Sequence, residues 1–272
     1  MKISAFYENI VTGAEASGIG MRAALERLKK AGMDRIYLMP QSWEKDKELL
    51  KEALPALGLE VEGLHSWILF PKNPSDTSYR GVIDLAAELG AEHVLFVPGM
   101  LTEDNTRRDI NSILAGMRAA VAYGSEKGIH VLMEDFDGLL SPFNSIAGLQ
   151  YFMDNIPGLG CAFDTGNFVM FHEDELEAAA VFADKIKFIH IKDRAMTPLR
   201  PGNRKKLCAD LGGIYPCTVG SGYIRIREIF EYLASRGIKA NAVAELYDCD
   251  PEYMLEDIEA SIRWIKENIP ND

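Results

Sequence analysis

Short apolar runs alternate with amphipathic helical segments along this chain, and this alternation constrains the fold more than any other feature. In residues 21–32, for example, Ala24, Leu25 and Leu28 lie on one helical face, and Gly32 supplies a typical C-terminal stop. The apolar runs between such segments are short and bounded by turn residues, which is typical of buried strands. We predict eight strands, at residues 2–7, 35–39, 59–66, 93–97, 130–134, 160–164, 186–190 and 241–245.

The order of these elements favours a parallel sheet, because parallel neighbours need a crossover connection that is usually a helix. Eight such units can close into a barrel, which typically takes about 250 residues. The chain has 272 residues, of which 47% are hydrophobic, so it can bury one large core. We therefore predict an α/β fold, a (βα)8 TIM barrel, with residues 1–272 forming a single domain.

Four of the predicted strands end on a carboxylate or an imidazole. The runs VLMEDF, CAFDTGN, KFIHIKD and AVAELYD carry Glu134, Asp164, His190 and Glu245 in turn. The C-terminal ends of barrel strands meet at one mouth, where active sites lie. Because a buried carboxylate is costly without a partner, the four together indicate one shared divalent metal ion. Their oxygen-rich set favours Mn²⁺ or Mg²⁺, with Co²⁺, Fe²⁺ or Zn²⁺ as alternatives.

These motifs make the chain resemble the xylose isomerase-like TIM barrel superfamily, which includes the sugar phosphate isomerase/epimerase family. The resemblance covers almost the whole chain and is carried by GIHVLMEDF, GLGCAFDTGN, IKFIHIKD, GSGYI and AVAEL, in that order. It implies that Glu134, Asp164, His190 and Glu245 bind one metal ion, and that Glu134 and Glu245 also move protons. The implied reaction removes a proton next to a carbonyl of a sugar, sugar phosphate or keto-acid, through a metal-stabilised enediolate.

The ligand set leaves the outcome of this reaction open. Return of the proton to the opposite face gives epimerisation, and return to the adjacent carbon gives isomerisation. Loss of a β-hydroxyl instead makes the enzyme a dehydratase or lyase that acts on a keto-sugar or an inosose. An AP endonuclease on the same barrel needs a histidine-rich trinuclear zinc site, but the chain has five histidines, and His93 and His130 begin strands at the opposite end. A non-catalytic sugar-binding barrel is the remaining alternative.

Six side chains are predicted to contact the substrate: His65, Trp67, Asn167, Lys192, Arg200 and Arg204. His65 ends the third strand, and Trp67 can stack on a sugar ring. The alternatives are a histidine bonded to backbone at the rim and an aromatic side chain packed in the wall. Lys192 shares the inward face of its strand with His190, and the alternative to a substrate contact is an ion pair with Asp193 or a glutamate. Asn167 stands where ketose epimerases of the resembled group usually have a histidine, and an amide can bind a hydroxyl but cannot carry a proton.

The segment after the seventh strand is longer than is usual in the resembled superfamily. Residues 194–220 contain several prolines and glycines and show no clear period, and loops of this kind are usually functional or disordered. We predict that this loop lies over the active-site mouth. Within its basic cluster, Arg200 and Arg204 are predicted to bind a phosphate or carboxylate of the substrate. The alternative is a solvated surface run.

The net charge and the hydropathy of the chain exclude some classes of binding partner. A net charge of −12 argues against a nucleic-acid partner, which favours an excess of Lys and Arg. No apolar run approaches the ~18 residues of a membrane span, and MKISAFYENI is too short and too polar for a secretory leader. The four cysteines show no CxxC spacing, which fits a reducing cytosol. We expect a cytoplasmic protein with a small carbohydrate or keto-acid substrate. The sequence does not decide whether the protein forms a homo-oligomer.

Overall fold

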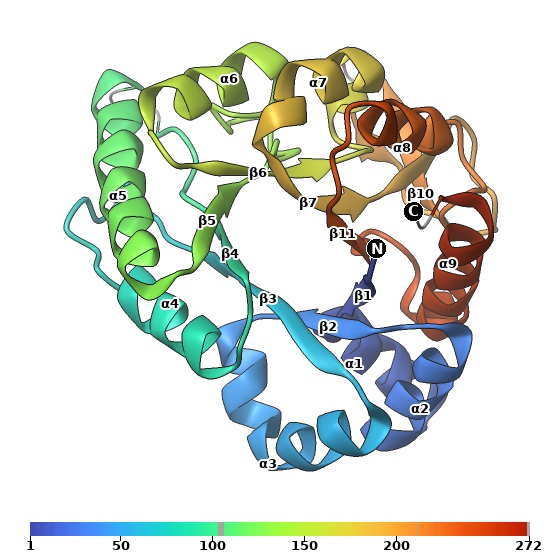
Figure 1. Ribbon diagram of the computed structural model, residues 1–272. Helices are drawn as coiled ribbons and strands as arrows, with labels where there is room; N and C mark the ends of the chain where they lie inside the picture. The colour runs from blue at the N-terminus through green and yellow to red at the C-terminus, as the bar shows by residue number, and fades with distance from the viewer. Residues whose placement is uncertain (103–105, 211, 271–272) are drawn as a thin grey trace.

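Eight parallel strands close into a barrel in the computed structural model, which describes residues 1–102, 106–210 and 212–270 (Figure 1). Each predicted strand is confirmed, with bounds that differ by one or two residues at most. The barrel strands are β1 (Ile3–Phe6), β2 (Arg35–Leu38), β3 (Glu60–Trp67), β4 (His93–Val97), β5 (His130–Met133), β6 (Gly160–Asp164), β7 (Ile186–Ile191) and β11 (Asn241–Ala244). The predicted (βα)8 TIM barrel fold is therefore confirmed.

The helices form a ring around the outside of the strands, as Figure 1 shows. They are α1 (Tyr7–Ser17), α2 (Met21–Ala31), α3 (Pro40–Leu57), α4 (Tyr79–Glu88), α5 (Thr106–Lys127), α6 (Ile146–Asn155), α7 (Glu175–Phe182), α8 (Ile226–Ser235) and α9 (Met254–Asn268). Helix α2 buries Ala24, Leu25 and Leu28, as its spacing predicts, and ends where Gly32 adopts a left-handed conformation with φ of 108°.

Alternation along the strands divides the core into two layers. Residues that point outward pack against the helices in one large apolar cluster. Residues that point inward fill the barrel with a smaller cluster, which comprises Phe6, Tyr37, Leu95, Leu132, Ala162, Phe188 and Val243. The inward positions of Ala162, Phe188 and Val243 place the next inward residue of each strand at the C-terminal mouth. These next residues are the predicted ligands Asp164, His190 and Glu245.

The long segment after β7 is ordered into a small antiparallel sheet, which the sequence did not indicate. Its strands are β8 (Asp193–Ala195), β9 (Lys206–Leu207) and β10 (Gly213–Cys217), in the order β8-β10-β9. We call this the inserted sheet. The sequence predicts a long loop at residues 194–220, and the structure shows that this segment contains short regular strands. Its strands are only two to five residues long, which is too short to give a period in the sequence.

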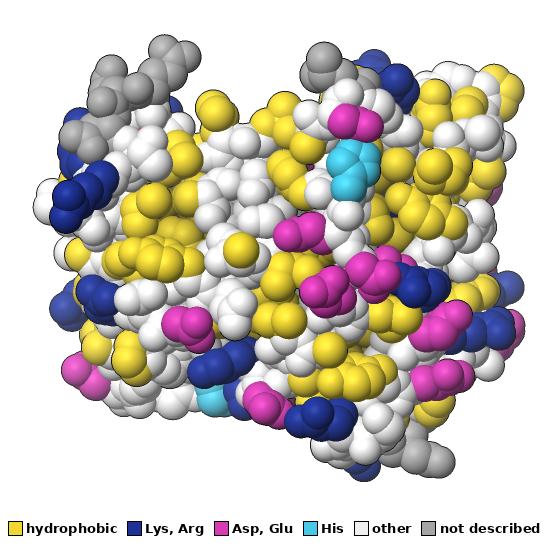
Figure 2. Space-filling view, turned by 90° about the horizontal axis from the view of Figure 1, so that it is seen from above, with side chains coloured by type: hydrophobic (Ala, Val, Ile, Leu, Met, Phe, Trp, Pro, Cys, Tyr) yellow, Lys and Arg dark blue, Asp and Glu magenta, His cyan; other side chains and the backbone are white. Residues whose placement is uncertain are grey.

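Charged side chains of both signs are intermixed on the face shown in Figure 2, without a continuous basic patch on that face. Across the described residues, no helix combines the length and apolarity needed to cross a bilayer.

Candidate functional site

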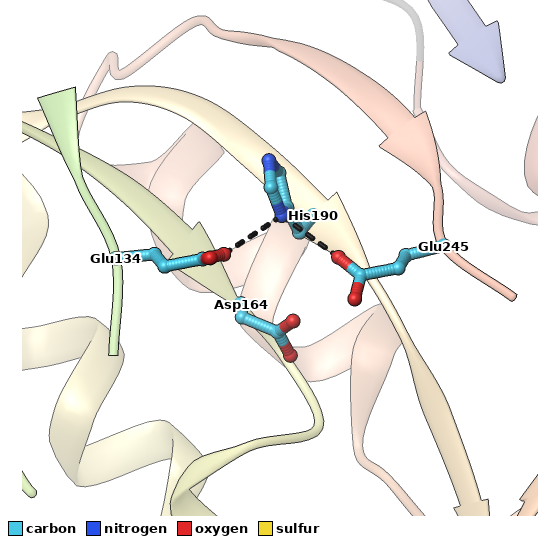
Figure 3. Close-up of side chains that lie close together, drawn as sticks. All are labelled: Glu134, Asp164, His190 and Glu245. Carbon is cyan, nitrogen blue, oxygen red and sulfur yellow. Dashed lines mark ion pairs between the residues drawn. The ribbon is translucent and has the colours of Figure 1, made fainter. Parts of the chain in front are cut away.

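Four predicted ligands from four neighbouring strands converge at the mouth of the barrel. Glu134 follows β5, Asp164 ends β6, His190 lies in β7 and Glu245 follows β11, and their side chains point toward one another (Figure 3). One ligand atom from each lies within 4.8 Å of the others, and all four residues are buried. His190 Nδ1 lies 2.8 Å from Glu245 Oε2 and 3.1 Å from Glu134 Oε2.

Strand register produces this convergence. Asp164 pairs with His190 across the β6–β7 ladder, and His190 pairs with Val243 across the β7–β11 ladder. Glu245 lies two residues beyond Val243, on the same face, and its backbone N–H donates to Ile191 O at 3.0 Å. The ligand positions are therefore fixed by the backbone of the barrel.

Several buried polar atoms at this point have no hydrogen-bond partner among the described residues. They are Asp164 Oδ2, both ring nitrogens of His190, and Glu245 Oε2. The contacts of His190 with the two glutamates, and the contact of Lys192 with Asp164 Oδ2, are at ion-pair distance but lack hydrogen-bond geometry. Orphaned atoms of this kind are rare in native interiors. Three carboxylates and one imidazole around one point fit a divalent cation, which would take one ligand atom from each residue, including one of the two ring nitrogens of His190.

The pKa values describe the same excess of negative charge. Burial raises the pKa of Asp164 to about 7, although Lys192 acts against this. Burial acts to lower the pKa of His190. The contacts with Glu134 and Glu245 outweigh this effect and raise the pKa to about 10. Burial acts to raise the pKa of Glu245, but Lys192 and His190 hold it well below its usual range. The cluster therefore keeps protons that a divalent cation would displace on binding.

Lys192 supplies an internal cation beside the ligands. Its Nζ lies 2.9 Å from Asp164 Oδ2 and 2.5 Å from Glu245 Oε1, and donates to Asn167 Oδ1 at 2.9 Å. Asn167 Nδ2 in turn donates to Asp135 O at 2.7 Å. Both predicted substrate-contact residues, Lys192 and Asn167, line the cavity above the ligands. Asn167 is held by these two contacts, which fix the direction of its amide.

His65 is positioned by a carboxylate from the first helix. Glu8 Oε2 lies 3.2 Å from His65 Nε2, while Glu8 Oε1 accepts from Met39 N at 2.8 Å and from Ser42 Oγ at 2.6 Å. Burial acts to raise the pKa of Glu8, but the contacts with His65 and the hydrogen bond from Met39 lower it below its usual value. His65 therefore presents its ring to the cavity with a charged partner behind it.

A cavity of about 270 Å³ opens above the ligands, slightly below the usual size range of ligand sites, roughly 300–1,000 Å³. Trp67 is 45% exposed at its rim and meets Phe136 edge to face, with ring centroids 5.0 Å apart. The lining residues are Phe6, Met39, His65, Ser66, Trp67, Leu95, Val97, Glu134, Phe136, Asp137, Asn167, His190, Lys192, Lys206, Glu245, Tyr247 and Asp248. This volume suits a ligand of monosaccharide size.

The structure does not bring Arg200 and Arg204 into this cavity. Arg200 forms a two-pronged pair with Asp257 of α9, with distances of 2.7 and 2.6 Å from Nη1 and Nη2 to the carboxylate oxygens. Arg204 is exposed and does not line the cavity. Among the basic residues of the segment 194–220, Arg194, Arg200, Arg204, Lys205 and Lys206, the one that lines the cavity is Lys206.

Sequence reasoning missed a repeated pattern around the two glutamates. Residues 134–137 and 245–248 both read Glu, any residue, aromatic, Asp. In each case the aromatic ring and the aspartate line the cavity, which adds Phe136 and Asp137 on one side and Tyr247 and Asp248 on the other. The recurrence of this spacing after two predicted ligands was the signal available in the sequence.

Comparison with known protein families finds one match, to the model described as xylose isomerase-like TIM barrel, over residues 25–268. No curated protein matches the sequence significantly.

Solved structures similar to this chain share its fold at low sequence identity. The probable 3-DHS dehydratase AsbF from Bacillus anthracis has a TM-score of 0.71 at 14% identity, covering 98% of this chain and 99% of that one. The IOLI protein with a bound zinc atom has a TM-score of 0.71 at 17% identity, covering 97% and 98%. The 3-keto-D-glucoside 4-epimerase YcjR from E. coli has a TM-score of 0.69 at 16% identity, covering 98% and 99%.

Proposed function

Because the chain belongs to the xylose isomerase-like TIM barrel family, we propose that it is a divalent-metal-dependent isomerase or epimerase of a small carbohydrate or keto compound. The observation that carries this proposal is the convergence of four buried ligand atoms within 4.8 Å of one another, directly below a cavity of monosaccharide size. Glu134, Asp164, His190 and Glu245 would hold one ion, with Mn²⁺ or Mg²⁺ the first candidates for an oxygen-rich set.

Glu134 and Glu245 are the proposed proton-transfer residues. They come from β5 and β11, lie on either side of His190, and both line the cavity. A bound divalent ion would act as a Lewis acid on the substrate carbonyl and so acidify the neighbouring C–H group. One glutamate removes that proton and the other, or the same one, returns it. Two carboxylates on opposite sides of a substrate allow return to either face, as epimerisation requires.

Positioning falls to the side chains around the ligands. Lys192 is held by Asp164, Glu245 and Asn167, so its side chain forms a fixed part of the cavity wall beside the proposed ligands. His65, oriented by Glu8, provides a polar contact, and Trp67 provides an apolar face. Loss of a β-hydroxyl after the same first step would make the enzyme a dehydratase. This is the second candidate reaction, because the probable dehydratase AsbF has a similar fold. Analysis of the product separates the two reactions.

The proposal is tested by proton exchange with solvent. The metal-stripped protein is reloaded with Mn²⁺, Mg²⁺, Co²⁺ or Zn²⁺ and incubated in D₂O with a panel of ketoses, keto-acids and inososes. We expect metal-dependent deuterium incorporation next to the carbonyl of at least one compound, detected by NMR. A vinylic product with loss of water would identify the dehydratase instead. Absence of both signals with every metal and compound would contradict an enzymatic role.

Two matched glutamate variants test whether Glu245 takes part in proton transfer. Glu245→Gln should lower the exchange rate by about 10²- to 10⁴-fold, the usual contribution of a general acid or base. Glu62→Gln is the control, since Glu62 is also a buried glutamate but does not line this cavity. Equal rates in the two variants would remove Glu245 from the proposed mechanism.

A further inference from the structure

We propose that the substrate is an electrically neutral polyhydroxy carbonyl compound, and that phosphorylated and carboxylated compounds are rejected. This proposal rests on the proposed function and adds a substrate class to it. It is carried by the pairing of the basic side chains at the cavity: among the described residues that line it, each lysine is already bound to two carboxylates.

Lys192 cannot serve an anionic substituent without giving up its present partners. Its Nζ contacts Asp164 Oδ2 and Glu245 Oε1 and donates to Asn167, and the whole side chain is buried. An incoming phosphate or carboxylate would have to share this ammonium with two fixed carboxylates. The repulsion between like charges in a poorly solvated site opposes such sharing.

Lys206 lies between the two aspartates of the repeated pattern. Its Nζ pairs with Asp137 Oδ2 and lies 3.0 Å from Asp248 Oδ2. The same two aspartates hold Arg194, which is 1% exposed, with Nη1 2.9 Å from Asp248 Oδ2 and Nη2 3.3 Å from Asp137 Oδ2. Two cations therefore share two carboxylates in a closed network at the cavity rim, which leaves no excess positive charge there.

The formal charges of the site sum to zero once a divalent ion is present. Five carboxylates and three cations contribute: Glu134, Asp137, Asp164, Glu245 and Asp248 against Lys192, Arg194 and Lys206. Without the ion, the sum is negative, and Glu8 behind His65 adds a further carboxylate. The site therefore offers no net attraction to an anion in either state.

The rim suits hydroxyl groups instead. An ionised carboxylate accepts hydrogen bonds only, so Asp137 and Asp248 present acceptors to the hydroxyl hydrogens of a sugar or cyclitol. Lys206 between them can donate to a hydroxyl oxygen while it keeps both aspartate partners, since an ammonium has three donors. Neither Arg200 nor Arg204, the two residues predicted to bind an anion, lines the cavity, and Arg200 is engaged by Asp257.

The test compares matched pairs of probes by isothermal titration calorimetry of the Mn²⁺-loaded protein, with repetition on the metal-free protein. The pairs are ketoses and their terminal phosphates, and an inosose with a cyclic keto-acid of similar size. We expect at least one neutral member to bind, and to bind at least tenfold more tightly than its anionic partner. A phosphorylated or carboxylated probe that binds as tightly as its neutral partner would overturn the proposal, and so would absence of binding by every neutral member. Neutral probes that bind without any solvent-deuterium exchange would instead contradict the proposed function alone.

Two variants sharpen this result. Asp248→Asn removes one carboxylate but leaves Asp137 for both cations, so affinity for the phosphorylated probe should rise about tenfold. Lys206→Met should leave the preference for the neutral probe in place. A selective loss of phosphate binding in Lys206→Met would show that this lysine anchors an anion and would overturn the proposal. Circular dichroism melting curves confirm that both variants are folded.

Discussion

Lys192 is the residue that most directly affects how the four ligands hold a cation. Its ammonium contacts two of them, Asp164 and Glu245, at 2.9 and 2.5 Å. Those carboxylates raise the pKa of Lys192 well above its usual value, although burial acts in the opposite direction. The side chain therefore stays charged and would compete with a bound metal ion for the same oxygens. At the scale of the residue, metal affinity is a balance between this ammonium and the excess of carboxylates.

Replacement of Lys192 by Met should tighten Mn²⁺ binding by about tenfold, a change of about 1.4 kcal/mol, because the two carboxylates lose their internal competitor. Catalytic turnover should fall in the same variant, because Asp164, Glu245 and Asn167 lose the ammonium that positions them. Calorimetric titration of the metal-free protein measures the affinity. Lys206→Met is the control, because Lys206 contacts Asp137 and Asp248 and none of the four ligands. Unchanged or weaker Mn²⁺ binding by Lys192→Met would contradict this balance.

Glu62 gives a pH-dependent prediction at the opposite end of the barrel. It is 1% exposed, with Arg35 Nη1 at 3.3 Å and Asn241 Nδ2 at 3.2 Å. Burial raises its pKa from 4.5 to about 7, although Arg35 acts against this. The folded protein therefore binds this proton more tightly than the unfolded chain, so the contribution of Glu62 to stability is present below pH 4.5 and is lost as the pH rises through about 7.

Removal of this titration should make Glu62→Gln progressively more stable relative to the wild type between pH 4 and pH 8. The difference in unfolding free energy should grow by up to about 3 kcal/mol across this interval, from the size of the pKa shift. Urea unfolding of both proteins at several pH values measures it. A difference that is constant with pH would show that Glu62 titrates normally in the folded state.

The convergence of Glu134, Asp164, His190 and Glu245 was predictable from the sequence because each follows or ends an apolar strand, and strand periodicity fixes the direction of its side chain. Asp137 and Asp248 lie three residues beyond their glutamates, where the chain has left the strand and periodicity no longer gives a direction. The pairing of Arg200 with Asp257 joins residues 57 positions apart, and nothing local to either residue indicates it.

At the scale of the element, the carboxylate of Asp193 in β8 joins the inserted sheet to the segment that follows it, residues 220–224. Asp193 Oδ2 accepts from the backbone N–H groups of Gly220 and Gly222, each at 2.9 Å, and Oδ1 accepts from that of Ile224 at 3.2 Å. These bonds fold the GSGYI motif back onto β8. The motif was visible in the sequence, but its partner was not, and the short strands of the sheet depend on this tertiary contact.

Gly222→Ala should disrupt this attachment. A Cβ atom at position 222 would collide with Arg194 O and with Asp193 Oδ1, so the loop would have to move and release its hydrogen bonds. We expect a loss of about 2 to 4 kcal/mol in unfolding free energy, in the range for strained or overpacked sites. Hydrogen exchange should increase in residues 193–195 and 213–224. The control is Gly81→Ala in α4, where nothing lies within 4 Å and a gain of up to about 1 kcal/mol is expected. Equal stability of the two variants would contradict the packing at Gly222.

At the scale of the whole molecule, the barrel concentrates buried carboxylates at one end, where a bound cation would balance their charge. The eight strands and their helices were predictable because each repeats the same pattern of a buried run and an amphipathic segment. The closed ring then brings β5, β6, β7 and β11 side by side, although Glu134 and Glu245 are more than 100 positions apart in the chain. A ligand that binds only this folded arrangement must stabilise the entire domain.

Divalent metal should therefore raise the unfolding free energy of the wild type. At a free concentration 100 times the dissociation constant, the expected gain is about 2.7 kcal/mol. Thermal or urea unfolding with and without Mn²⁺ measures it. The double variant Glu134→Gln, Asp164→Asn should lose most of this gain, while Glu62→Gln should keep it. An equal gain in all three proteins would place the ion elsewhere.

The most direct test of the account is an anomalous difference map from crystals soaked in Mn²⁺. The account predicts one strong peak between Glu134, Asp164, His190 and Glu245, with each side chain contributing a ligand atom at about 2.0 to 2.3 Å. A map without a peak at this point, or with the only peak bound by other residues, would contradict it.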